Sequence, residues 1–188
     1  VIVRDRDQKE RIAAVWKRTW DFYLATFARA PARPGEDAAT RQRTVGVATQ
    51  MVEHMAEVPA IIFVGVKRDE ALAKVLSSPA TFAAAARHLG VGSTVRLVAN
   101  SIRTSGIADG STAYPAVQNL LLAARALGLG AVLTTPHFFV PGDFERILGI
   151  PKSVTLAAII PVGYPLGKFG PVRRPTPQAV VSWDRYGA

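Results

Sequence analysis

Few residues of this sequence form a recognisable catalytic motif. The sequence contains no cysteine, and the usual serine-hydrolase, P-loop and zinc-protease patterns do not occur in it. The three histidines, His54, His88 and His137, are far apart and lack the spacing of a metal site. We therefore expect neither a metal nor a catalytic side chain. His137 stands out only because it follows Thr134 and Thr135 at the end of a predicted strand.

A bound cofactor could supply the chemistry that these side chains cannot. In that case the protein provides binding, orientation and hydrogen bonds. Arg173 and Arg174 are adjacent in a C-terminal segment rich in glycine and proline, where two guanidinium groups could together bind a phosphate. A solvated pair of charges is the simpler interpretation of the same residues.

The charge of the chain indicates an anionic partner. Its formal net charge is +9 and its pI is about 10.5, which fits a nucleic acid, a membrane surface or a phosphorylated small molecule. The basic residues are scattered, however, and the apolar runs are too short to cross a bilayer. We expect no nucleic-acid or membrane partner, although charge alone keeps nucleic-acid binding as an alternative. The lack of cysteine favours a cytoplasmic location.

The elements that would position these residues alternate between helices and short buried strands. With 188 residues, 49% of them hydrophobic, the chain is expected to form one domain, residues 1–188. A capping box at Asp7 and Glu10 would begin the first helix. Apolar patterns predict strands at 1–4, 61–66, 131–135 and 155–162, and helices up to about Phe27, at 38–57 and at 141–148. This order favours an α/β or α+β fold with a central sheet.

Residues 69–112 are expected to form an excursion from this core. Their pattern predicts helical turns at 70–75 and a helix at 79–89, followed by a stretch that the glycines between positions 90 and 110 loosen. A mobile, lid-like segment and an ordinary helical insertion both fit this pattern.

The next predicted helix, residues 113–127, is apolar on nearly every side. Such a helix belongs in the centre of a fold or at a subunit interface. Ser111 or Thr112 can cap it, Pro115 suits its first turn, and Gly128 supplies the residue that ends it.

Several segments together resemble the FMN-dependent nitroreductases. YPAVQNLLLAARALGLGAVLTT is followed by LGIP, AAIIPVGYP, RRP and VSWDRYG in the family's order and spacing over about residues 113–187. The opening VIVRDRDQKERIAAVW resembles the first strand and helix that follow the family's N-terminal flavin motifs. The resemblance implies an α+β fold with a central mixed or antiparallel sheet flanked by helices. It also implies an intertwined homodimer with FMN at the subunit interface.

The resemblance further implies where the flavin would bind. The backbone at Leu133, Thr134 and Thr135 would pass beside the isoalloxazine ring, and Arg173 and Arg174 would hold the phosphate. Threonine hydroxyls and free amides at a strand end are suitable donors for such a ring, so the residue types agree with this placement.

Two departures from the family pattern matter for this site. Pro136 has no amide hydrogen, so a family contact through a backbone N–H at that position is lost. The family's N-terminal phosphate motif and Asn-rich flavin loop would lie just before Val1, and we expect that this upstream segment is missing from the sequence.

The activity implied by the resemblance is ping-pong hydride transfer. NADH or NADPH would reduce FMN and leave, and a small acceptor such as a nitroaromatic or a quinone would replace it. Residues 69–112 and Phe138 or Phe139 would cover the flavin. A deazaflavin in place of FMN is one alternative, and a non-catalytic relative that binds a flavin or nucleotide without turnover is another.

Overall fold

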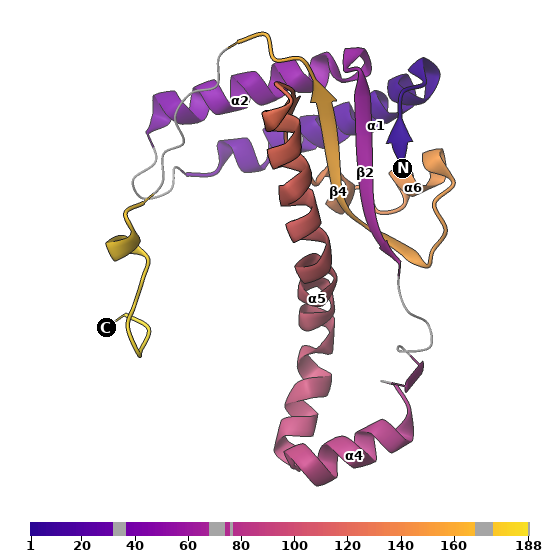
Figure 1. The fold of residues 1–188 in the computed structure, drawn as a ribbon, viewed down its shortest axis with the longest axis vertical. Helices are drawn as coiled ribbons and strands as arrows, with labels where there is room; N and C mark the ends of the chain where they lie inside the picture. Colours follow the sequence, from indigo (N-terminus) through magenta and orange to yellow (C-terminus); the bar gives the residue numbers. More distant parts are fainter. Residues whose placement is uncertain (32–36, 68–73, 76, 168–174, 188) are drawn as a thin grey trace.

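The computed structural model describes residues 1–31, 37–67, 74–75, 77–167 and 175–187, with the backbone alone for 101–109 (Figure 1). Its centre is a four-stranded antiparallel sheet in the order β1-β2-β4-β3. The strands are β1 (Ile2–Val3), β2 (Ala60–Lys67), β3 (Gly130–Ala131) and β4 (Val154–Gly163). The helices are α1 (Arg6–Ala25), η1 (Phe27–Arg29), α2 (Ala38–Glu53), η2 (Met55–Glu57), α4 (Pro79–Leu89), α5 (Val91–Ala126), η3 (Pro136–Phe138), α6 (Asp143–Leu148) and η4 (Pro177–Ala179). The predicted α+β fold with a central antiparallel sheet is confirmed.

The two long strands β2 and β4 form the middle of the sheet and are covered on both faces. Because neighbouring side chains of a strand point to opposite faces, Ile61 and Phe63 pack on one side and Ile62 and Val64 on the other. The pairing shifts register after Val64. A Cβ at Gly65 would lie 2.7 Å from Val154 Cγ1, so any larger residue at this position would displace the Val154 side chain.

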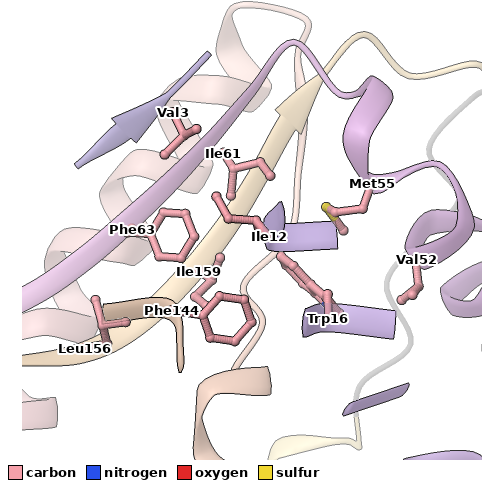
Figure 2. Packing of buried hydrophobic residues seen from close by; sticks show 10 residues of the cluster. All are labelled: Val3, Ile12, Trp16, Val52, Met55, Ile61, Phe63, Phe144, Leu156 and Ile159. Carbon is pink, nitrogen blue, oxygen red and sulfur yellow. The ribbon is translucent and has the colours of Figure 1, made fainter. Parts of the chain in front are cut away.

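One face of the sheet carries the larger core, which α1 and α6 cover (Figure 2). Ile12 and Phe144 are 0% exposed, and the Phe144 ring meets Trp16 edge-on at 6.3 Å between centroids. Asp143 at the start of α6 pairs with Arg18 of α1 and with Arg146. The pair with Arg18 joins the start of α6 to α1, and the pair with Arg146 lies within α6.

The helix α1 begins two residues earlier than the capping box at Asp7 and Glu10 predicts. The N-cap is Asp5, whose carboxylate accepts from the backbone N–H of Gln8 at 2.8 Å. Asp5 has an extended backbone directly after β1, so it meets the geometric requirement for a cap before Asp7 does. Glu10 instead accepts from the Arg6 side chain.

The opposite face of the sheet is covered by α5, which is longer than the sequence pattern predicts. Two predictions are wrong here: that glycines loosen the chain after residue 90, and that a helix starts near Ser111. One continuous helix runs from Val91 to Ala126 through Pro115. A glycine costs a helix only about 1 kcal/mol, which packing can offset. At Gly110 the missing side chain makes room for the Tyr114 ring, because a Cβ there would lie 2.8 Å from that ring.

Figure 1 shows α4 and the half of α5 nearest to it projecting away from the sheet. We call α4 and residues 91–109 the helical arm. Its two helices pack on each other, and Gly90, with φ of +81°, makes the turn between them. The predicted helix at 79–89 is confirmed, whereas the turns predicted at 70–75 lie largely outside the described residues.

The strand predicted at 131–135 is shorter than expected. β3 ends at Ala131 on the edge of the sheet, and a single bridge from Thr134 to Ile159 is all that continues it. The strands predicted at 61–66 and 155–162 and the helix ending at Leu148 are confirmed. Within the described residues, no helix is long and apolar enough to cross a bilayer.

Candidate functional site

The candidate site begins where the chain leaves the edge of the sheet, at Leu133, Thr134 and Thr135. The Thr134 amide donates to the Ile159 carbonyl at 3.0 Å, and the Ile159 amide donates back at 3.0 Å. The Thr134 hydroxyl also donates to the Ile159 carbonyl. Thr134 therefore anchors this segment to β4, and its donors are already used.

The residues on either side of this anchor keep their donors. The amides of Leu133 and Thr135 form no hydrogen bond within the part of the chain that the structure describes. Leu133 is 36% exposed, so the segment lies at the surface of the single chain. Thr134 fixes the segment in place, and the amides of Leu133 and Thr135 on either side remain as two hydrogen-bond donors. This arrangement suits a ligand with several acceptor atoms.

A turn of 3₁₀ helix, η3, follows directly. Pro136 occupies its first position, where no amide hydrogen is needed, and the Phe138 amide donates to the Thr135 carbonyl at 3.2 Å. Phe138 is 60% exposed. Phe139 packs against Phe22 and Phe27, at 5.6 and 5.8 Å between ring centroids.

This aromatic cluster, Phe22, Phe27 and Phe139, was not expected from the sequence. Its rings come from α1, η1 and the residue after η3, so only the fold brings them together. All three remain close to half exposed. Phe22 and Phe27 are five residues apart, a spacing that does not place two side chains on one face of a helix, so no local pattern indicated this cluster.

His137 differs from the other histidines by its burial. It is only 6% exposed, and neither ring nitrogen has a hydrogen-bond partner in the described structure. Burial lowers the pKa of His137 to about 4. The backbone of Leu156 is close enough to offset part of this shift, although it does not meet the geometry of a hydrogen bond to either ring nitrogen. The imidazole is therefore neutral at physiological pH.

The remaining predicted site residues are not placed. Arg173 and Arg174 lie outside the described residues, so the structure does not test the phosphate contact. A hollow of about 250 Å³ opens next to the candidate segment, lined by Ala131, Val132, Pro161, Val162 and Tyr164 among others. It is mainly apolar and lies at the open edge of the sheet beside β3.

Solved structures with the same fold are known, all with low sequence identity to this chain. Iodotyrosine deiodinase bound to FMN and 3-iodo-L-tyrosine matches with a TM-score of 0.56 and 20% identity, over 99% of this chain and 75% of that one. A BluB-like flavoprotein from Clostridium difficile 630 matches with a TM-score of 0.55 and 18% identity, over 97% and 77%. A nitroreductase family protein from Streptococcus pneumoniae TIGR4 matches with a TM-score of 0.54 and 16% identity, over 97% and 76%.

At these identities the structural matches establish the fold. The sequence comparison goes further, because residues 1–164 match the model of the nitroreductase family. This match includes β1, α1, the helical arm and the candidate segment at Leu133 to Thr135. The chain therefore belongs to the nitroreductase family.

Proposed function

We propose that this protein is an FMN-dependent oxidoreductase that binds its flavin at Leu133, Thr134 and Thr135. The observation that carries the proposal is the pair of unpaired amides at Leu133 and Thr135, on a segment that Thr134 fixes to β4. An isoalloxazine ring presents carbonyl and nitrogen acceptors along one edge, so this donor set fits it. The FMN in the iodotyrosine deiodinase structure supports the choice of cofactor.

Bound FMN would accept hydride from NADH or NADPH and then reduce a nitroaromatic, a quinone or a related acceptor at the same face. The chain's own residues would bind and orient the ring. The exposed Phe138 and the aromatic cluster at Phe139 supply apolar surface that would exclude water from it. Arg173 and Arg174 would hold the phosphate through their guanidinium groups.

A second copy of the chain would complete this site. Large apolar side chains of α5 are exposed in the single chain, including Val91 at 70%, Val95 at 62% and Leu122 at 57%, and Leu127 directly after the helix is 76% exposed. Several large exposed apolar side chains on one helix favour a subunit interface. We infer a cytoplasmic homodimer in which the helical arm covers the flavin.

Flavin binding is tested directly with the purified full-length protein. We expect flavin absorbance in the protein as isolated, or saturable binding when FMN is titrated in, and oxidation of NADH or NADPH when an acceptor is present. Protein that neither carries nor binds FMN would contradict the proposal. Binding of a deazaflavin in its place would correct the cofactor.

The same experiment separates an enzyme from a binding protein. Bound flavin that neither nicotinamide reduces would identify a flavin-binding relative without turnover. Reduction by one nicotinamide but not the other would name the electron donor.

A further inference from the structure

The buried imidazole of His137 forms no hydrogen bond in the described structure. Both of its ring nitrogens are covered and lack a hydrogen-bond partner, whereas most buried polar groups in proteins have one. Its ring lies against Phe138, at 4.4 Å between centroids. A phenylalanine or leucine could fill the same space without leaving a polar group unsatisfied, so packing alone does not account for a histidine.

The position of His137 connects it to the candidate flavin segment. His137 lies two residues after Thr135, so the two Cα atoms are at most about 7.6 Å apart. The turn between them is held by the bond from the Phe138 amide to the Thr135 carbonyl. A three-ring heterocycle bound by the Thr135 amide would therefore lie within reach of the His137 side chain.

The chemistry of a neutral imidazole matches the edge of such a ring. It offers one N–H donor and one acceptor nitrogen, and a flavin ring carries carbonyl acceptors beside an N–H donor. Because both imidazole nitrogens are covered, His137 must change its side-chain rotamer to reach a ligand. Turning out would give the polar group the partner that it lacks when buried.

We propose that His137 is a flavin-binding residue whose imidazole turns from its buried position to hydrogen-bond the isoalloxazine ring. This inference rests on the proposed function, since it requires that FMN binds at Thr135. It assigns a side-chain contact to a site otherwise built from backbone amides. It also explains why a histidine occupies a position where an apolar residue would stabilise the fold.

The test compares FMN affinity with thermal stability in matched variants. His137→Phe keeps the ring shape without the nitrogens, and His137→Gln keeps a donor and an acceptor. For His137→Phe we expect FMN to bind about tenfold more weakly, while the melting temperature without FMN is no lower than that of the wild type. His137→Gln should bind FMN within about threefold of the wild type, and His54→Gln, at the exposed C-terminal end of α2, serves as the control.

If His137→Phe weakens FMN binding without lowering the melting temperature, His137 contacts the ligand. A loss of both would instead indicate that the residue serves packing. A His137→Phe protein that binds FMN as tightly as the wild type would overturn the inference and leave the proposed function intact. A wild-type protein that does not bind FMN would overturn the proposed function itself.

A second measurement uses the wild type and does not depend on a variant that folds. The chain has three histidines, so nitrogen-15 labelling of histidine gives a simple NMR spectrum. On adding FMN, the ring nitrogens of His137 should shift as they gain a partner, while those of the exposed His54 stay unchanged. Unchanged His137 signals at saturating FMN would overturn the inference.

Discussion

The core between α1 and the sheet and the helical arm differ in how their apolar side chains are covered. In the core, Ile12 and Phe144 are completely buried by residues of the same chain. In the arm, Phe82 is 41% and Val91 70% exposed, although both residues are as apolar as those of the core. The difference indicates that one chain is sufficient to build the sheet and its core, whereas the arm needs a further surface to cover it.

The largest effect should come from emptying the core. Phe144→Ala removes a ring that contacts Trp16 and Phe63, so the free energy of unfolding should fall by about 3–5 kcal/mol. Urea denaturation measures this change. The matched substitution Phe82→Ala on the arm should cost less than about 1 kcal/mol, and equal losses at the two positions would remove the distinction between the regions.

A second effect, of about 3 kcal/mol, should appear as a dependence of stability on pH. The pKa of His137 is about 4 in the folded protein, against an ordinary value of 6.5. Between these values the unfolded chain binds a proton that the folded chain does not, so stability should fall as the pH drops from about 6.5 to 4. Urea titrations at several pH values measure this slope.

The control for the pH effect is His137→Phe, which should lose this part of the slope. The exposed His54, whose pKa is raised by its hydrogen bond to Glu57, titrates in both proteins and cancels in the comparison. A slope that is identical in the two proteins would show that His137 is not buried in neutral form.

The third effect, about 1 kcal/mol, concerns the start of α1. Asp5→Ala removes the carboxylate that accepts from the Gln8 amide, and the melting temperature should fall accordingly. Asp7→Ala leaves the cap intact and should change stability by only a few tenths of a kcal/mol through the helix dipole. A larger loss at Asp7 would instead favour the capping box expected from the sequence pattern.

A substitution on the surface of the helical arm should have the smallest effect on the free energy of unfolding. It should, however, weaken the association of two chains. Val95 is 62% exposed, so Val95→Ser should leave the free energy of unfolding of one chain within about 0.5 kcal/mol. If a second copy covers this face, the same change should weaken dimer formation in sedimentation equilibrium. A dimer of unchanged affinity would show that something else covers the arm.

The elements with clear sequence patterns were predictable from local signals. Apolar runs identified β2 and β4, and Gly149 marked the end of α6, where its φ of +65° favours glycine. These signals are sufficient because each depends on a few neighbouring residues.

The missed features depend on contacts that local patterns do not contain. Pro115 and the glycines predicted a break in α5, but the helix is continuous, and around Pro115 it packs against the sheet through Ala113 and Val117. Thr134 was expected to offer donors to a ligand, yet the fold uses them to reach Ile159. The phosphate contact of Arg173 and Arg174 stays a prediction, since both lie outside the described residues.

Amide NMR spectra recorded during a titration with FMN test the central claim most directly. The amides of Leu133 and Thr135, which lack partners, should shift as they bond to the flavin ring, and the amide of Thr134, already bonded to Ile159, should shift least. FMN that binds without moving the Leu133 and Thr135 signals would contradict the account, because the flavin would then lie elsewhere on the molecule.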